Sequence, residues 1–265
     1  MTTTPAETPP YSLFQTERQR EIVGLTATAG RVEVAELSAR YNVTTETIRR
    51  DLSELQTHRL VRRVHGGAVP WERDGFEPLL SVRNDRQENE KQRLAQAAIA
   101  EIPESGSIII DSGSTLSAFA SAVPPQTSIR IVTNSLNIAQ TLSERSQADV
   151  IVIGGKVRKN TLAMVDTQAI AEIEPITVDT LFISADGLSA ATGLSTPYRE
   201  EAALKRAMIR SARRVVALVD HSKFSQEHFM RFASWADIDV LITNTEADPA
   251  DIAAIEAAGT TVVLT

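Results

Sequence analysis

The sequence contains no cysteine, so it can form no disulfide bond, offers no thiol nucleophile and cannot build a cysteine–zinc site. Long hydrophobic runs are also missing, because no stretch approaches the ~20 apolar residues that a membrane-spanning helix needs. The first ten residues, MTTTPAETPP, lack the basic and apolar segments of a signal peptide. We therefore expect a cytoplasmic protein without a membrane partner, in which residues 1–15 form a disordered tail.

Positive charge is scarce, since 27 basic residues stand against 34 acidic ones and the formal net charge is −7. Such a balance by itself argues against a nucleic-acid partner. The charge is unevenly distributed, however: residues 1–70 hold nine arginines against eight acidic residues, and the remainder is strongly acidic. This asymmetry indicates that any DNA contacts lie in the N-terminal part.

The 265 residues, 42% of them hydrophobic, have ordinary globular composition and suffice for one small and one medium domain. We predict a small N-terminal domain over residues 16–70, a linker over 71–86 and a larger α/β domain over 87–265. Pro70, Gly75 and Pro78 support the linker because they interrupt regular elements.

Residues 16–58 show the spacing of three short helices. Thr16 can cap the first helix, Gly30 can end it, and Thr44 can cap the third after a tight turn at Asn42. The apolar positions at helical spacing are Ile22, Val23 and Leu25, then Val34, Leu37 and Tyr41, then Ile48, Leu52 and Leu55.

The third predicted helix presents a polar face opposite its aliphatic stripe. At about 100° per residue, Arg49, Arg50 and Ser53 point away from Ile48. Arginine can bond guanine or clamp a phosphate, and threonine can contact a thymine methyl group, so this face suits the major groove. The alternative is a surface helix whose arginines are merely solvated. The residues of this helix that we expect to contact DNA are Thr45, Thr47, Arg49, Arg50 and Ser53.

The segment VRRVHGGAV follows, with two short extended runs around a glycine pair. Arg62, Arg63 and His65 make a basic hairpin tip that can lie along the DNA backbone, and Gly66 and Gly67 permit close approach. His65 alone could equally be an ordinary surface histidine. Helix and hairpin together predict a winged helix-turn-helix that binds double-stranded DNA.

The run RVEVAELSARYNVTTETIRRDLSELQTHRLVRRVHGGAV, from Arg31 to Val69, resembles the N-terminal signature of the DeoR family of bacterial regulators. The resemblance implies that TIRRDL lies on the recognition helix and RVHGGA on the wing.

From residue 87 onwards, buried-type apolar runs alternate with helical stretches, beginning with an Ala-rich helical pattern to residue 102. This alternation predicts a mainly parallel α/β sheet covered on both faces. The runs are SIIID to Asp111, IRIVT to Thr133, DVIVI to Ile153, TLFIS to Ser184, RVVALVD to Asp220, VLIT to Thr243 and the final TVVLT.

The motif DSGST, from Asp111 through Ser112, Gly113 and Ser114 to Thr115, follows a predicted strand and opens a predicted helix. Amide groups and hydroxyls at a helix N-terminus form an anion site, and glycine lets the backbone come close. The motif lacks a P-loop lysine and the spacing of a dinucleotide fingerprint, so it predicts a single phosphate group. The alternative is a well-capped helix without a ligand.

Polar residues also follow four other predicted strands, at the carboxyl ends where α/β sheets bind ligands. Basic side chains there would neutralise a phosphate, and Asn134, Asp186 and Asp220 could bond sugar hydroxyls. Asp186 or Asp220 taken singly could instead be a turn or helix cap. The predicted effector-binding residues at these ends are Asn134, Ser135, Gly154, Gly155, Arg158, Asp186, Gly187, Asp220 and Lys223.

This part resembles the DeoR sensor domain through DSGST, VTNS, IGGKVR, ISADGLSAATGLS, EEAALKRAMI and DHSKF, in that order. The resemblance implies a fold like ribose-5-phosphate isomerase and an effector that is a phosphorylated sugar or polyol. It adds Glu200 and Lys205 to the residues that line the pocket or hold it together. Asp166 stands where many relatives have glycine, so either it points away from the phosphate or the pocket differs there.

Together with these residue patterns, the resemblance implies a transcriptional repressor of sugar uptake or catabolism genes, relieved by a phosphorylated sugar and needing no cofactor, metal or catalytic residue. Within the family, the helix and wing sequences look most like regulators of sugar-phosphotransferase genes, which makes a fructose-system repressor and fructose 1-phosphate the first guess. The expected partners are operator DNA and further copies of the chain, in a dimer or tetramer.

The competing hypothesis is an active sugar-phosphate isomerase that carries a DNA-binding domain. That chemistry needs a general base, whereas Asp186-Gly187 is followed by Leu188-Ser189, with no acid at the comparable place. Glu200, Glu201 and Asp220 stay conceivable as bases. A structural DNA-binding protein without a ligand would leave the strand-end motifs unexplained.

Overall fold

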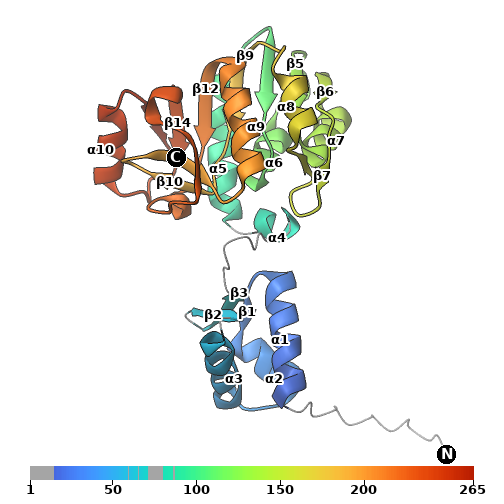
Figure 1. The fold of residues 1–265 in the computed structure, drawn as a ribbon, viewed down its shortest axis with the longest axis vertical. Coiled ribbons are helices and arrows are strands. Elements are labelled where there is room, and N and C mark those ends of the chain that lie inside the picture. The colour runs from blue at the N-terminus through green and yellow to red at the C-terminus, as the bar shows by residue number, and fades with distance from the viewer. Residues whose placement is uncertain (1–14, 59, 65, 71–79, 86) are drawn as a thin grey trace, which may run out of the picture. The chain divides into compact units, whose positions relative to one another are not determined.

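The computed structural model describes residues 15–58, 60–64, 66–70, 80–85 and 87–265, which form two compact units divided between Pro78 and Leu79 (Figure 1). Most of the predicted tail, residues 1–14, and most of the predicted linker, residues 71–79 and 86, lie outside the described residues. Within the described parts of the chain, no helix has the length and apolar character needed to cross a membrane.

The first unit contains three helices and a small antiparallel sheet in the order β1-β3-β2. Its first helix ends where Gly30 adopts a φ of 72°, its second ends at the left-handed Asn42, and Thr44 caps the third by accepting a hydrogen bond from the Thr47 amide at 3.2 Å. These three predicted helix ends are thus confirmed. The predicted cap at Thr16 is wrong, because Gln15 before it is already helical. The elements are α1 Gln15–Ala29, β1 Val32–Glu33, α2 Val34–Tyr41, α3 Thr45–Thr57, β2 Val61–Val64 and β3 Gly67–Pro70.

The core of this unit forms from the predicted apolar stripes, and Ile22, Ile48 and Leu52 are fully buried in it. A buried ion pair that the sequence pattern did not indicate joins α1 to α3: Arg18 Nε lies 2.6 Å from Asp51 Oδ2. Because a buried charge is costly without its partner, this pair favours one arrangement of the two helices. It holds the acid of TIRRDL inside the unit while the arginines of that motif stay on the surface.

The second unit is built on a seven-stranded sheet in the order β15-β14-β12-β9-β4-β5-β6. Every neighbouring pair in it is parallel, so the predicted α/β class with a mainly parallel sheet is confirmed. All seven predicted runs supply strands, which are β4 Ser107–Ile110, β5 Arg130–Thr133, β6 Asp149–Val152, β9 Val178–Ile183, β12 Ala212–Leu218, β14 Val240–Thr243 and β15 Thr261–Leu264.

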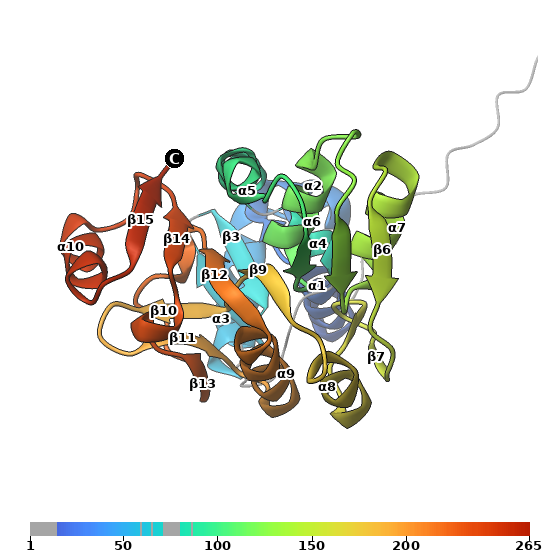
Figure 2. The ribbon, with the colours of Figure 1, turned by 90° about the horizontal axis from the view of Figure 1, so that it is seen from above.

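Helices cover both faces of this sheet: α5, α6 and α7 lie on one side, and α8 and α9 on the other (Figure 2). Side chains alternate between the two layers, since Ile108 and Ile110 pack in one apolar cluster and Ile109 in the other. Burial on both faces explains why these strands are continuous apolar runs. The helices are α4 Leu80–Asp85, α5 Glu88–Ala98, α6 Ser114–Ala122, α7 Leu136–Arg145, α8 Thr167–Ile173, α9 Arg199–Arg210 and α10 Pro249–Ala257, with short 3-10 turns at Ile99–Glu101 (η1), His221–Lys223 (η2) and Trp235–Asp237 (η3).

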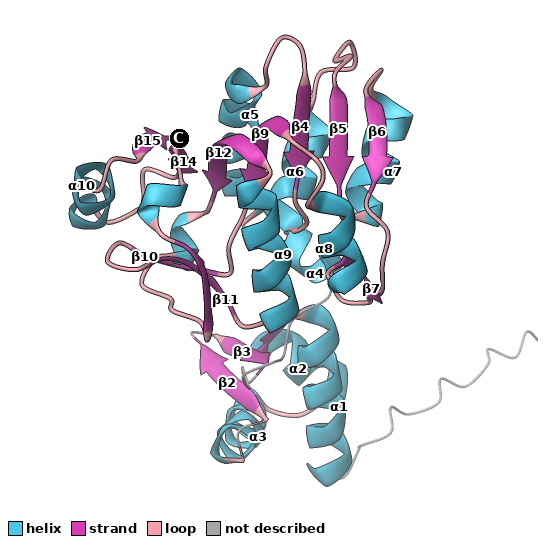
Figure 3. Ribbon diagram, turned by 45° about the horizontal axis from the view of Figure 1, so that its top comes forward, coloured by secondary structure: helices cyan, strands magenta, loops and turns pink. Residues whose placement is uncertain are grey.

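Two features of this unit were not predicted. Short strands form an antiparallel sheet, β10-β11-β13, and a separate pair, β7-β8 (Figure 3). Their bounds are β7 Val157–Arg158, β8 Ala163–Met164, β10 Gly187–Ser189, β11 Gly193–Thr196 and β13 Met230–Ala233. In addition, helix α4 lies inside the stretch assigned to the linker, because the proline and glycine signals end at Pro78, before it begins.

Candidate functional site

The exposed face of α3 and the neighbouring strand β2 form a shallow groove, which we call the α3 face. It is lined by Thr44, Glu46, Thr47, Arg49, Arg50, Ser53 and Arg63. Five of the predicted DNA-contacting residues therefore share one surface, although the helix and the strand are separate elements. Thr45 and Arg62 are also exposed, and each is next in the sequence to a residue that lines the α3 face.

Hydrogen bonds tie strand β2 to helix α3. Arg63 Nη1 donates to Ser53 Oγ at 2.8 Å, and the Arg63 amide donates to Gln56 Oε1 at 2.8 Å. Arg49 Nη1 lies 3.3 Å from Glu46 Oε2, but both side chains are exposed, at 53% and 82%. Because exposed ion pairs contribute little, Arg49 can leave Glu46 for a base or a phosphate.

The two glycines of the wing serve different purposes. Gly66 is exposed and adopts a φ of 77°, which the hairpin turn requires. A Cβ on Gly67 would overlap the Val32 carbonyl, so this glycine permits the pairing of β3 with β1. This packing role was not predicted; a close approach of Gly67 to DNA stays a prediction. His65 lies outside the described residues.

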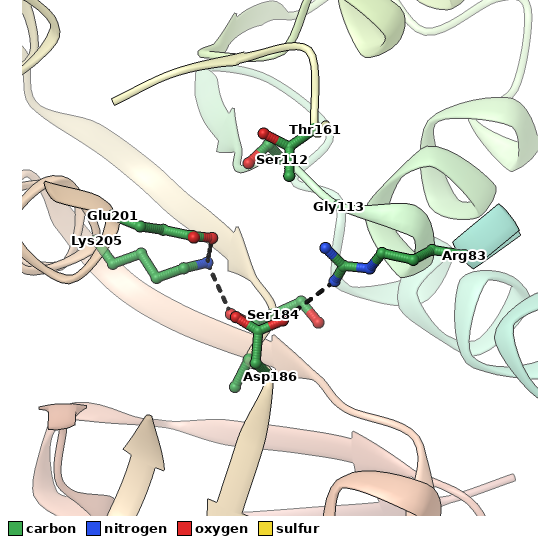
Figure 4. A pocket seen from close by; sticks show the side chains of 9 residues that line it. Arg83, Ser112, Gly113, Thr161, Ser184, Asp186, Glu201 and Lys205 are labelled. Atoms are coloured by element: carbon green, nitrogen blue, oxygen red, sulfur yellow. Dashed lines mark hydrogen bonds and ion pairs between the residues drawn. The ribbon is translucent and has the colours of Figure 1, made fainter. Parts of the chain in front are cut away.

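A polar pocket lies at the carboxyl ends of β4 and β9 in the second unit (Figure 4). Ser112 and Gly113 follow β4 and Asp186 follows β9; because these strands are parallel neighbours, their ends meet. The interior volume is only about 10 Å³, room for about one water molecule. The polar pocket is lined by Arg83, Ser112, Gly113, Thr161, Ser184, Ala185, Asp186, Glu201 and Lys205.

Lys205 is the deepest cation of the polar pocket, with 2% of the residue exposed. Its Nζ donates to Asp111 Oδ2 and to the Ser184 carbonyl at 2.9 Å, and it lies 3.8 Å from Glu201 Oε1. Burial works against the charged amine, but the negative charges of Asp111 and Glu201 outweigh it and raise the pKa of Lys205. Lys205 therefore stays protonated and holds the ends of two strands together.

The other carboxylates of the polar pocket differ in charge state. Burial raises the pKa of Glu201, and the negative charges of Asp186 and Asp111 raise it further, against Lys205 and Arg158. Burial also opposes ionisation of Asp186, but nearby cations, Arg83 first, prevail and lower its pKa. Asp186 is thus the fixed anion, and Glu201 is the carboxylate that more readily takes up a proton.

Three buried oxygen atoms near the polar pocket have no hydrogen-bond partner within the described part of the chain: Asp111 Oδ1, Asn134 Oδ1 and Thr161 Oγ1. Buried polar atoms are bonded in the great majority of cases, so an unpaired group calls for an explanation. Hydroxyl groups of a ligand could provide the donors and acceptors. The first turn of α6, with Ser114 and Thr115 buried, adds amide groups that point out of the helix end.

The glycine pair after β6 is absent from the lining of the polar pocket, and two backbone amides of this loop face carboxylates. The Gly154 amide donates to Glu172 Oε2 at 2.6 Å, and the Lys156 amide donates to Asp166 Oδ2 at 3.0 Å. Asp166 also caps α8 through the Ala169 amide at 3.1 Å, and these amide hydrogen bonds lower its pKa. The Asp166 carboxylate is therefore a helix cap and does not line the polar pocket.

Other predicted residues play structural parts. Ser135 caps α7, and Asp220 caps the turn η2 by accepting from the Ser222 amide at 3.0 Å. A Cβ on Gly187 would overlap the Gln226 carbonyl. Lys223 is absent from the pocket lining, but its charge helps to lower the pKa of Asp186.

Arg158 and Asn134 hold the wall of the polar pocket. Arg158 Nη1 binds Glu201 Oε2 at 2.8 Å, and its guanidinium lies 4.0 Å from the centre of the Tyr198 ring. Asn134 Nδ2 donates to the Met164 carbonyl at 3.1 Å. These contacts agree with the predicted role of holding the site together; their part in ligand binding stays a prediction.

Sequence reasoning did not place five residues of the pocket lining in the effector site: Arg83, Thr161, Ser184, Ala185 and Glu201. Glu201 was considered only as a conceivable base. Glu200, which the resemblance favoured, is exposed on α9, whereas its neighbour Glu201 is buried. The spacing of Glu201 four residues before Lys205 is a signal that could have found it. Arg83 carries no such local signal, because it lies in the stretch assigned to the linker.

Family models match both units. One described as the DeoR-like helix-turn-helix domain matches residues 18–73, and one described as the DeoR C terminal sensor domain matches residues 86–245.

Curated proteins match over nearly the full length. The chain is 36% identical over 251 residues to the HTH-type transcriptional regulator GlpR of Haloferax volcanii, across 95% of this chain and 98% of that protein. It is 32% identical to the glycerol-3-phosphate regulon repressor of Escherichia coli, across 87% and 91%. The HTH-type transcriptional repressor GlcR of Bacillus subtilis is 28% identical, across 88% and 89%.

Solved structures with a similar chain path include ribose 5 phosphate isomerase A of Neisseria gonorrhoeae, at 18% identity and a TM-score of 0.40, over 53% of this chain and 55% of that one. The full-length sorbitol operon regulator SorC of Klebsiella pneumoniae matches at 9% identity and a TM-score of 0.41, over 92% and 99%. Likeness at this level supports no statement about activity.

The full-length relatives are named as regulators and repressors, not as enzymes. Together the two matched domains cover most of the sequence, in the order that the residue patterns predict. The chain belongs to the DeoR family of DNA-binding transcriptional regulators.

Proposed function

We propose that this chain represses sugar uptake or catabolism genes and that a phosphorylated sugar or polyol in the polar pocket relieves the repression. The observation that carries the proposal is the buried, charge-rich pocket in a helix-turn-helix protein. Its unpaired Asp111 and Thr161 oxygens lie near the N-terminal end of α6, which suits a ligand that has both hydroxyl groups and a phosphate.

The ligand chemistry follows from the groups around the polar pocket. Amide groups and hydroxyls between Ser112 and Thr115 would hold the phosphate, since a helix N-terminus favours an anion. Asp186 and Thr161 would bond hydroxyls of the sugar. We propose fructose 1-phosphate as the first effector to test. Glycerol 3-phosphate comes second, because three of the similar repressors are named for its regulon.

The proposed coupling needs more than one copy of the chain. A helix-turn-helix reads one half-site, and paired heads hold two half-sites at a set spacing. An effector that binds better when that spacing is wrong lowers operator affinity by the coupling free energy, typically ~1–3 kcal/mol or about 5–150-fold. Ligand-promoted DNA binding is the opposite outcome of the same measurement.

The test is an operator-binding titration with the full-length chain, using a duplex selected by the protein from a random pool. Fructose 1-phosphate and glycerol 3-phosphate are added in turn, with fructose, glycerol and inorganic phosphate as controls. We expect only a phosphorylated compound to weaken DNA binding. If no phosphorylated sugar or polyol changes operator affinity at millimolar concentration, the proposal fails.

A matched pair of variants locates the effect. Thr161→Val removes an unpaired hydroxyl from the polar pocket and should weaken the response to ligand while leaving DNA binding intact. Thr141→Val, on α7, removes a hydroxyl that bonds the Asn137 carbonyl instead, and should leave both unchanged. An equal loss of ligand response in both variants would show that the polar pocket is not the effector site.

A further inference from the structure

We propose that Arg83 leaves Asp186 and binds the effector's phosphate instead, and that this change of partner moves helix α4. The inference rests on the proposed function and assigns to this site a ligand-binding residue and a moving part. Arg83 Nη2 lies 3.2 Å from Asp186 Oδ1, and 18% of each side chain is exposed. In Figure 4 Arg83 enters the pocket from the side opposite Glu201 and Lys205.

The first argument is charge. Each of three carboxylates (Asp111, Asp186, Glu201) is already paired with a cation (Lys205, Arg83, Arg158), and Lys223 adds its charge near Asp186. A phosphate group brings about −1.5 to −2 charges at neutral pH. A cation that turns from its carboxylate to the phosphate would offset this added charge.

Arg83 is the cation best placed to make this exchange. The side chain of Lys205 is 3% exposed and its amine is held by Asp111, Ser184 and Glu201. Arg158 is bound by Glu201 and stacks on a tyrosine ring. Arg83 lies nearer to solvent than Lys205 does, and a guanidinium offers two parallel N–H groups to a phosphate. Asp186, once released, can accept hydrogen bonds from sugar hydroxyls.

The second argument is space. An interior of about 10 Å³ holds about one water molecule, so movement of part of the wall would make room for a sugar phosphate. The lining residues other than Arg83 follow β4 and β9, lie on α9 or, for Thr161, lie between β7 and β8. Helix α4 has six residues and supplies only Arg83 to the pocket lining within the described residues.

Helix α4 is held by contacts at its first and fourth residues. Leu80 is buried, its amide donates to the Asn160 carbonyl at 2.8 Å, and Lys91 Nζ donates to the Arg83 carbonyl. A short element at the surface opens at lower free-energy cost than the central strands of a sheet. Leu80 is the second residue of the second unit, so α4 is the first described helix of that unit.

The test compares Arg83→Gln with Arg93→Gln in the full-length protein. Arg93 lies on α5 in an exposed pair with Glu246, so its replacement removes the same charge away from the polar pocket. Calorimetric titration uses fructose 1-phosphate and glycerol 3-phosphate as probes. Arg83→Gln should weaken binding of the phosphorylated probe about tenfold or more, Arg83→Lys should weaken it less, and Arg93→Gln should change it less than about twofold.

A second measurement follows α4 itself by hydrogen exchange. In the wild type, a bound probe should speed exchange of the amides in residues 80–85. In Arg83→Gln these amides should already exchange fast without the probe and respond no further. Unchanged exchange of α4 in a ligand-saturated wild type would overturn the movement.

The outcomes separate this inference from the proposed function. If neither probe binds the wild type, the proposed sensor function fails and this inference fails with it. If the wild type binds and Arg83→Gln binds equally tightly, only the role of Arg83 is overturned. Should Arg83→Gln fail to fold by circular dichroism, Arg83→Lys carries the comparison, because it keeps the charge and loses the two-pronged contact.

Discussion

In the proposed function, the α3 face and the polar pocket bind the same kind of partner, an anionic group, but their charged residues differ in exposure. Arg49 and Glu46 of the α3 face are 53% and 82% exposed, whereas the side chains of Lys205 and Asp111 are 3% and 1% exposed. Exposed charges cost little free energy to move, and an exposed ion pair contributes little to the stability of the fold. Buried charges are fixed by their partners and are costly to separate.

The difference matches the size of each partner. A DNA backbone is long and highly charged, so mobile surface cations can meet it and release its counterions. A small ligand has few contacts, and therefore needs groups that are already oriented and dehydrated. The head unit also has a buried pair, Arg18 with Asp51, and it joins two helices rather than facing the α3 face. Buried charges in this protein thus have fixed geometry, whereas the surface predicted to bind DNA carries exposed charges.

The largest expected effect is on stability and concerns the buried charges of the polar pocket. Lys205→Met leaves Asp111 and Glu201 without their buried cation and should destabilise the second unit by about 3–5 kcal/mol. Urea unfolding followed by hydrogen exchange in β4, β12 and α3 distinguishes the two units. Arg210→Met is the control, because Arg210 is exposed at the end of α9 and its loss should change stability by less than about 0.5 kcal/mol. A loss confined to α3 would contradict the assignment.

A smaller effect, on the affinity for DNA, is expected when an exposed arginine of the α3 face is replaced. Arg49→Ala should weaken operator binding by about 1–3 kcal/mol if Arg49 contacts a base, and relax the preference at that position. Stability and ligand binding should stay unchanged. The control is Arg20→Ala, an exposed arginine of α1 outside the α3 face. Fluorescence anisotropy with matched and mismatched duplexes measures both; equal losses in the two variants would place the recognition surface elsewhere.

Arg63 should act on the DNA backbone rather than on bases. Arg63→Ala should weaken binding to all duplexes alike and make the slope of log affinity against log salt about one unit less steep. The variant also loses the bond to Ser53, which links β2 to α3. Titrations at several salt concentrations check this prediction, and a change in sequence preference instead would identify Arg63 as a base reader.

The smallest effect concerns Asp166. Asp166→Ala removes the cap of α8 and the bond to the Lys156 amide, and should lower the melting temperature slightly while leaving ligand affinity unchanged. Asp166→Asn should retain part of the stability, since asparagine also caps helices. A clear loss of ligand affinity in Asp166→Asn would return this residue to the pocket.

The pH dependence of this cap has a definite sign. The pKa of Asp166 is lowered from its ordinary value of 3.8 because the charged carboxylate accepts amide hydrogen bonds. The stabilisation is therefore present above that ordinary value and disappears as the pH falls through the lowered pKa. Melting curves of wild type and Asp166→Ala should differ at neutral pH and converge in acid.

The local patterns of the sequence were reliable where one element decides the outcome. Thr44 as a cap, the stripe of Ile48, Leu52 and Leu55, and the seven apolar runs all depend on residues a few positions apart. The α/β class followed from the alternation of these runs with helices. The short strands β7, β8, β10, β11 and β13 carry no strong pattern, because contacts with other segments form them.

The candidate sites show the same division. Residues of the α3 face come from one helix and an adjoining hairpin, so their grouping could be predicted from helical periodicity. The polar pocket depends on pairs far apart in sequence: Arg83 with Asp186 across 103 positions and Lys205 with Asp111 across 94. Glu200 and the Gly154–Gly155 pair were chosen from local motifs, and the structure places them outside the pocket lining.

The sequence alone predicted two units. One is the helix-turn-helix with its basic surface, and the other is a parallel sheet with polar residues at its strand ends. Both could be predicted because short-range periodicity and turn chemistry encode them. Tertiary structure alone decided which polar residues share the pocket, which carboxylate is the fixed anion, and that Arg83 closes one side. Those outcomes depend on strand order and on burial, since parallel neighbours bring distant segments together and low solvent exposure sets the cost of each charge.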